Sequence, residues 1–250
     1  RWLQSKNVFA FYFSPQVSRL KKVFVIFTLK PPLFKTSKMK FSHFLKYVPK
    51  IAKESLPAAI AHAKMIPPER IEFLNNQDFS KIIPKKAAVL MLLYPKNKMT
   101  HLALIVRNSY PGIHASQIAF PGGKVEDSDL SLCETALRET EEEIGVAAKK
   151  VTVIRSFTQV YIPPSNFLVY PFLGFAKEEL LFTLSPDEVD QVIELPLYEF
   201  LDEKNVISTK MSTSYASNIQ IPAFKINEHL VWGATAMMMS ELKEILKKVL

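Results

Sequence analysis

The feature that most constrains this chain is the stretch Phe120 to Val146, in which two glycines lead into an acidic segment with helical spacing. An α-helix advances about 100° per residue, so positions i, i+3 and i+4 share one face. Glu139, Glu142 and Glu143 therefore fall on the same side of the helix. The residues that gather on a different side are Cys133, Leu137, Thr140 and Ile144. This pattern predicts a helix that buries one face and keeps its carboxylates accessible.

The clustered glutamates favour a divalent metal site. Like charges at i,i+4 destabilise a helix by roughly 0.2 to 0.5 kcal/mol per pair, so a compensating cation is expected. Hard ions such as Mg²⁺ or Mn²⁺ prefer oxygen ligands. An acidic run alone is more often a solvated helix face. Here, however, Gly122 and Gly123 precede the helix and let the backbone approach a ligand closely. We therefore expect metal ligands from the three glutamates and from Gly123.

The same residues resemble the box of the Nudix hydrolases, G-x5-E-x7-R-E-U-x-E-E-x-G-U, in which U is a bulky aliphatic residue. Gly123 fits the opening position, and Thr140 stands at a U position. Asp129 occupies the place of the early Glu, and eight residues instead of seven separate it from Arg138, which is a one-residue insertion. The residues that match the second half of the box are Arg138, Glu139, Glu142, Glu143, Gly145 and Val146.

The residues before the box look like the coenzyme A pyrophosphatase branch of that family. In this branch an H-x-x-Q-x-x-F-P-G-G run precedes the box, and here it reads His114, Gln117 and 120–123. The resemblance covers roughly residues 86 to 250. It implies an α/β/α sandwich with a mixed central sheet and a loop-helix box. It also implies hydrolysis of the pyrophosphate bond of coenzyme A (CoA) and acyl-CoA, yielding 3′,5′-ADP and 4′-phosphopantetheine or its acyl form.

Other functions stay open at this point. Within the family, the substrate could be ADP-ribose, a dinucleoside polyphosphate or a nucleoside triphosphate. The fold could also serve as a binding module with an inactive site, although the complete set of glutamates argues against that reading. Glu142 and Glu143 are the expected catalytic carboxylates, and Arg138 is expected to orient them. Which glutamate acts as the base is left unassigned.

Five residues outside the helix are candidates for substrate binding. Arg107 is the last residue of a predicted strand and either faces the substrate's phosphates or is a solvated charge at the strand end. His114 and Gln117 belong to the following loop, and only the family resemblance gives His114 more than a structural role. Ser165 and Asn166 lie in a turn where this family often selects its substrate, although both residue types also form ordinary turns.

The organisation of the chain follows from its breakers and its apolar runs. Residues 1–38 look like an upstream or unstructured extension before Met39. Residues 39–85 are expected to form an N-terminal helical segment, and residues 86–250 are expected to form the Nudix domain. Pro49 and Pro57 divide the second part into short helices, in which His62 is expected to be a surface group. A terminal amphipathic helix is expected at 232–250, with its methionines filling the core. The predicted strands span 87–94, 101–107, 151–162, 167–176 and 219–226.

The net charge of +8 does not by itself indicate a polyanionic partner. The first 53 residues hold 12 bases and no acid, which leaves 20 of the 32 bases against all 24 acids in the remaining chain. We therefore expect a small-molecule substrate, with no nucleic acid and no membrane, and a monomer or a homodimer. An RNA-binding role for the basic start is the competing hypothesis, which deletion of 1–38 would test.

The compartment is inferred from the single cysteine, Cys133, which suits a reducing environment. A cytoplasmic location is expected. The alternative is a mitochondrial one, if the acid-poor residues 1–38 act as a transit peptide.

Overall fold

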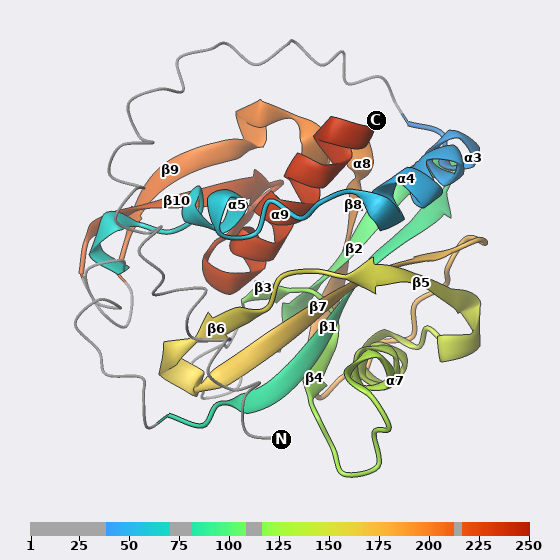
Figure 1. Ribbon diagram of the computed structural model, residues 1–250, viewed down its shortest axis with the longest axis horizontal. Helices are drawn as coiled ribbons and strands as arrows, with labels where there is room; N and C mark the ends of the chain where they lie inside the picture. Colours follow the sequence, from blue (N-terminus) through green and yellow to red (C-terminus); the bar gives the residue numbers. More distant parts are fainter. Residues whose placement is uncertain (1–38, 71–81, 109–116, 213–216) are drawn as a thin grey trace.

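The computed structural model describes residues 39–70, 82–108, 117–212 and 217–250, and in them a mixed eight-stranded sheet organises the chain (Figure 1). The main strand order is β3-β2-β1-β7-β5, while β4 pairs with β1, β6 with β7 and β8 with β2. These strands are β1 (Lys85–Lys96), β2 (Met99–Arg107), β3 (Ile118–Ala119), β4 (Gly122–Lys124), β5 (Val151–Ser156), β6 (Val160–Ile162), β7 (Phe167–Ala176) and β8 (Val189–Pro196).

The β1–β2 hairpin is tighter than the sequence predicted. The predicted strands left residues 95–100 between them, but the turn consists only of Asn97 and Lys98, which both adopt positive φ angles, of 49° and 63°. Two consecutive residues with positive φ form the hairpin turn whose twist matches that of the flanking strands. On its other side β1 pairs in parallel with β7, from Lys85 opposite Phe167 to Leu93 opposite Phe175, which makes the sheet mixed.

The predicted strand over 151–162 divides into β5 and β6. Both pair antiparallel with β7, β5 along 172–176 and β6 along 167–169. Pro171 lies between the two paired stretches and has no N–H to donate, so the ladder is interrupted there. Only its carbonyl is used, as the acceptor of the Phe157 N–H at 2.8 Å.

Helices cover both faces of the sheet, and the predicted α/β/α layering is confirmed. Side chains alternate along β1. Leu90 and Leu92 pack toward α7 (Leu132–Ile144), whereas Met91 and Leu93 pack toward α9 (Gly233–Val249). Figure 1 shows the two helices on opposite sides of the strands. The methionines 237–239 at the start of α9 are buried, as expected of core residues.

The remaining elements complete the layers. A smaller sheet with the order β11-β10-β9 lies beyond β8, joined to it by short helices. Its strands and the connecting helices are α8 (Leu197–Leu201), η4 (Glu203–Asn205), β9 (Val206–Met211), β10 (Ile219–Ile226) and β11 (His229–Val231). The short 3₁₀ helices on either side of β5 and β6 are η2 (Ala148–Lys150) and η3 (Pro163–Ser165). No helix of the described residues is long and apolar enough to cross a membrane.

The N-terminal helices share the core on the α9 side of the sheet. Phe44 and Ile51 are buried in the same apolar cluster as Leu246 of α9. The helices of this segment are α3 (Phe41–Phe44), η1 (Leu45–Tyr47), α4 (Val48–Lys53) and α5 (Ala59–Ala63). The expectation that His62 is a surface group is wrong, because its side chain is buried and lies 3.5 Å from the carboxylate of Glu241 on α9.

Glu241 anchors this segment to the rest of the fold. Its buried carboxylate accepts hydrogen bonds from the Ala58 N–H at 2.9 Å, the Thr158 N–H at 3.0 Å and the Thr158 hydroxyl at 2.6 Å. The same carboxylate therefore joins α5, the β5–β6 connection and α9. Donors that lose a buried partner cost about 1–3 kcal/mol, so each of these contacts matters for stability.

We expect Glu241→Ala to lower the free energy of unfolding by about 2 kcal/mol, because it leaves buried donors without an acceptor. Glu244→Ala is the matched control on the same helix, since Glu244 pairs with Lys64 at the surface, where an ion pair contributes below about 1 kcal/mol. Urea unfolding of both variants measures the difference. Equal stability of the two variants would show that the Glu241 contacts do not hold the segment.

Candidate active site

Helix α7 positions the acidic side chains, and its ends are set by local sequence. Ser131 is the N-cap, and its hydroxyl accepts the Glu134 N–H at 3.2 Å. Gly145 ends the helix with a φ of 72°, a left-handed conformation that favours glycine. The predicted glutamates therefore occupy the last two turns. On the buried side of the helix lie Thr140 and Ile144, while Cys133 and Leu137 are only half-buried.

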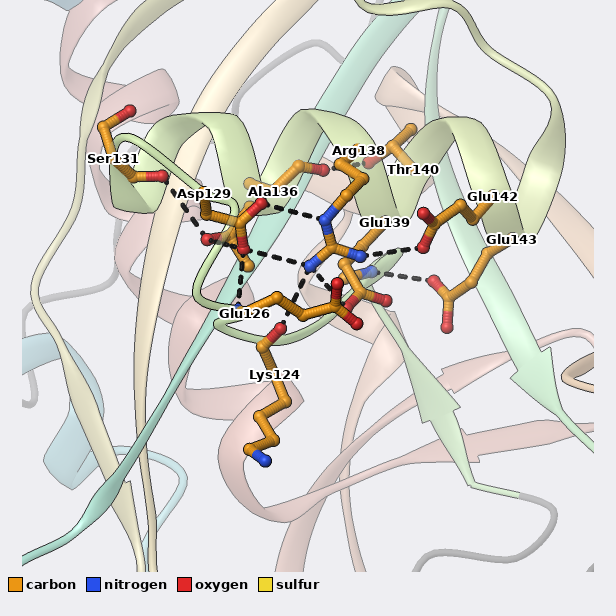
Figure 2. A network of polar contacts seen from close by, with 12 residues as sticks. Lys124, Glu126, Asp129, Ser131, Ala136, Arg138, Glu139, Thr140, Glu142 and Glu143 are labelled. Carbon is orange, nitrogen blue, oxygen red and sulfur yellow. Dashed lines mark hydrogen bonds and ion pairs between the residues drawn. The ribbon is translucent and has the colours of Figure 1, made fainter.

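Arg138 is the centre of a polar network that draws together the loop before the helix and the helix itself (Figure 2). Its guanidinium donates two hydrogen bonds to Asp129, from Nε at 2.9 Å and Nη2 at 3.0 Å. It also donates to Glu142 at 2.8 Å and to Glu139 at 3.1 Å. A further bond, at 3.1 Å, reaches the backbone carbonyl of Lys124. One cation thus fixes three carboxylates and the end of β4.

Asp129 holds Arg138 in place and also receives hydrogen bonds from two other residues. The carboxylate is 3% exposed and also accepts the Thr135 hydroxyl and the Glu126 N–H, each at 2.9 Å. The Arg138 guanidinium is the main cause that holds the pKa of Asp129 well below its usual range. The loop takes up the extra residue before the helix, since Leu130 projects into solvent. The shorter acid at this site is therefore compatible with a firm contact to Arg138.

Glu143 is buried, which corrects the expectation that all the carboxylates stay accessible. Its side chain is 1% exposed, compared with 53% for Glu142. Strand β4 covers it, and the Gly122 N–H donates to its Oε2 at 2.7 Å. Arg107 of β2 donates to its Oε1 at 3.2 Å. Burial raises the pKa of Glu143 to about 7, although the Gly122 N–H and the Arg107 charge act in the opposite direction.

Gly123 leaves room for the Glu139 carboxylate, which lies where a side chain at position 123 would be. A Cβ on Gly123 would come within 2.2–2.5 Å of the carboxylate atoms of Glu139, closer than any real contact. The absent side chain therefore forms a cradle for this carboxylate against the backbone of β4. Burial is the main cause that raises the pKa of Glu139, and the Arg138 charge opposes it.

A cavity of about 620 Å³ opens on the other side of β4. Gly122 and Gly123 line it, so the strand that contacts Glu143 and Glu139 also borders the cavity. The predicted residues Arg107, Gln117 and Ser165 line it as well. Much of the remaining wall is apolar, with Phe167 on β7 and Trp232 at the start of α9. Its volume and mixed polarity are those of a site for a small organic ligand.

The two other residues predicted to bind substrate are Asn166, which does not line this cavity, and His114. Asn166 is absent from the cavity's lining, and its side chain holds the turn. Its amide accepts the Tyr161 hydroxyl at 3.0 Å and donates to the Ile83 carbonyl at 3.2 Å, and its φ of 54° suits a left-handed turn position. His114 lies outside the described residues.

Comparison with known proteins decides the family. A family model described as the NUDIX domain matches residues 84–213. The chain belongs to the Nudix family. It is similar to an uncharacterised Nudix hydrolase NudL of Photorhabdus laumondii, with 32% identity over 178 residues that cover 71% of this chain and 89% of the relative. It is also similar to the Nudix hydrolase NudL of Yersinia enterocolitica, with 33% identity over 165 residues that cover 63% of this chain and 80% of the relative.

Among solved structures, the Nudix hydrolase RenU of Mycobacterium smegmatis is similar over 67% of this chain and 88% of its own, with 16% identity and a TM-score of 0.46. Family membership supports a hydrolase activity for this chain. The names of the NudL relatives specify no substrate.

The chemistry of the Nudix box fits a hard divalent cation. The predicted donors are the carboxylates of Glu139, Glu142 and Glu143 and the backbone carbonyl of Gly123, all oxygen ligands of the kind that Mg²⁺ and Mn²⁺ prefer. In the structure two arginines neutralise these carboxylates. Across 39–70, 82–108, 117–212 and 217–250, no three His, Cys, Asp or Glu side chains already converge as a metal site.

Three residues without a predicted role lie near the glutamates or line the cavity. Glu188, in the loop before β8, contributes a negative charge that raises the pKa of both Glu139 and Glu143. Lys124 and Arg70 line the cavity, and no local pattern singles them out, because their positions depend on strand pairing and on the N-terminal segment.

The buried Glu143 predicts a pH dependence of stability in the metal-free protein. Its folded pKa of about 7 exceeds the ordinary value of 4.5. Between these two values the carboxyl ionises in the unfolded state but stays protonated in the folded state, so the free energy of unfolding falls as the pH rises from 4.5 to 7 and levels off above 7. We expect wild type to lose about 3 kcal/mol between pH 4.5 and 8 relative to Glu143→Gln. Urea unfolding of both proteins in chelator measures this difference, and parallel curves would contradict it.

Proposed function

We propose that this Nudix hydrolase cleaves the pyrophosphate bond of CoA and acyl-CoA. The observation that carries the proposal is the cavity beside the Nudix box, which combines cationic and apolar walls. Arg70, Arg107 and Lys124 line it, and no Asp or Glu appears among its described lining residues. A polyanion with a large apolar or flat portion suits such a lining, and CoA unites a diphosphate, an adenine and a long pantetheine arm.

The diphosphate is expected to lie at the β4 end of the cavity. Gly122 and Gly123 border the cavity there and at the same time contact Glu143 and Glu139. Arg107 also links the two sides, since it lines the cavity and pairs with Glu143 at 3.2 Å. Its guanidinium is therefore placed to contact a phosphate oxygen while it keeps the buried carboxylate oriented.

Glu139, Glu142 and Glu143 would hold the divalent cation, together with the backbone of Gly123. When bound, Mg²⁺ or Mn²⁺ neutralises pyrophosphate charge and activates water. Arg138 keeps Glu139 and Glu142 in place through its bonds to both, and Asp129 in turn fixes Arg138. In the reaction a water oxygen bonds to phosphorus and the bridging P–O bond breaks, which gives 3′,5′-ADP and 4′-phosphopantetheine.

A product assay tests this proposal. Purified protein is incubated with CoA, acetyl-CoA and ADP-ribose, each with Mg²⁺ or Mn²⁺, and the products are identified by mass. We expect 3′,5′-ADP with 4′-phosphopantetheine or its acetyl form. Cleavage of ADP-ribose to AMP and ribose 5-phosphate with CoA left intact would refute the CoA assignment and favour a nucleoside diphosphate sugar.

A further inference from the structure

The floor of the cavity extends well beyond the Nudix box. Register pairs Lys124 of β4 with Ala87 of β1, Ala87 with Val169 of β7, and Val169 with Val160 of β6. Adjacent strands lie about 4.8 Å apart, so the three steps from β4 to β6 span roughly 14 Å. The cavity therefore has a near end at the Nudix box and a far end at β6.

The far end contains the cation of Arg70, and it also contains a serine hydroxyl that has no hydrogen-bond partner among the described residues. Arg70 lines the cavity there, and its Nη2 donates to the backbone carbonyl of Tyr161 on β6 at 3.4 Å. Ser165 lines the same cavity just after β6, and its hydroxyl oxygen is buried with no hydrogen-bond partner in the described part of the chain. A buried polar group left unsatisfied costs about 1–3 kcal/mol, which a ligand oxygen would recover.

We infer that Arg70 and Ser165 form a second anion site, which binds the 3′-phosphate on the nucleoside arm of the substrate. This inference rests on the proposed function and adds to it a residue pair that selects the substrate. A phosphate monoester offers several acceptor oxygens at once. A guanidinium carries five N–H donors in a planar arrangement that suits such oxygens, and Ser165 adds an O–H. The described cavity lining holds no carboxylate that would repel this phosphate.

The spacing of the two ends agrees with such a ligand. The floor spans roughly 14 Å, and an anion bound at each end would lie about one hydrogen-bond length, about 3 Å, inside that end. The distance between two anions bound in this way would therefore be about 8 Å. That separation is comparable with the distance between phosphates on the 5′ and 3′ oxygens of one nucleotide. CoA carries both phosphates, whereas dephospho-CoA and ADP-ribose lack the 3′-phosphate. The far end therefore distinguishes CoA from these close relatives.

Paired kinetics test the site. The ratio of kcat/KM for CoA to that for dephospho-CoA is measured in wild type, Arg70→Ala, Arg70→Lys and Ser165→Ala. We expect Arg70→Ala to reduce this ratio about 10- to 100-fold, the equivalent of a lost hydrogen bond to a charged group. Ser165→Ala should reduce it less, and Arg70→Lys should restore part of it. Lys64→Ala removes a surface charge from the same segment and should leave the ratio unchanged.

A binding experiment on the unaltered protein covers the case in which a variant misfolds. Calorimetry with 3′,5′-ADP and with 5′-AMP should show about 10- to 100-fold tighter binding of the bisphosphate. Equal affinities, or an unchanged kinetic ratio in folded Arg70→Ala, would overturn the second anion site while CoA cleavage by wild type still supports the proposed function. Failure of wild type to cleave either CoA or dephospho-CoA would refute both.

Discussion

Glu142→Gln is expected to fold as wild type does and to lose roughly 10³-fold in kcat, because it removes the charge of a carboxylate that is proposed to bind the metal. The substitution keeps the shape of the side chain. Glu142 is 53% exposed, and its contact with Arg138 at 2.8 Å can be kept by the amide oxygen of glutamine. The measurements are the rate of product formation at saturating Mg²⁺ and the midpoint of thermal unfolding.

Glu141→Gln is the control for this prediction. Glu141 is exposed on the same turn and accepts the Ala148 N–H at 3.1 Å, a bond that glutamine can also accept. It lies outside the glutamate positions of the Nudix box, so its kcat should stay within about twofold of wild type, as expected of a surface change. Equal losses in the two variants would mean that helix charge in general, and not a specific ligand, supports turnover.

Arg138→Ala is expected to lower the free energy of unfolding by about 4 kcal/mol, because it leaves the buried carboxylate of Asp129 without its cation. Asp129 is 3% exposed and receives two of the bonds that Arg138 donates. Urea unfolding of Arg138→Ala, Asp129→Asn and the double variant gives the coupling energy. We expect the double variant to be clearly more stable than the two single losses predict, since no buried charge is left unpaired.

Strictly additive losses would contradict this account of the pair. They would mean that Arg138 stabilises the protein through its contacts with Glu139, Glu142 and the Lys124 carbonyl, and not through Asp129. Those contacts are at 3.1 Å and 2.8 Å, and the second is made to an exposed carboxylate. Exposed pairs of that kind contribute below about 1 kcal/mol, which separates the two explanations clearly.

Local pattern was a good guide where the structure is local. The strands at 167–176 and 219–226 match β7 and β10 in their bounds, since runs of β-branched and aromatic residues indicate strands directly. The helix of the Nudix box was predicted from its spacing, and its ends follow from Ser131 and Gly145. The division of 151–162 was missed, because it depends on Pro171 in the partner strand.

Features that arise from long-range packing could not be predicted. Glu143 and Glu142 are neighbours of the same type, yet only Glu143 is covered by β4, and helical spacing cannot show which neighbour strand lies over it. His62 is buried because α9 brings Glu241 against it. Arg70 reaches the cavity only because the N-terminal helices pack against the same core as the sheet.

The residues that line the cavity come from the matched domain and also from the segments before and after it. The glutamates and Gly123 lie within residues 84–213, whereas Arg70 precedes this range and Trp232 and Met238 follow it. If this cavity binds the substrate as proposed, its shape depends on segments outside the matched domain that pack on the same core as the sheet. Substitutions in those segments are therefore expected to alter which molecule is accepted while the glutamates of the box stay in place.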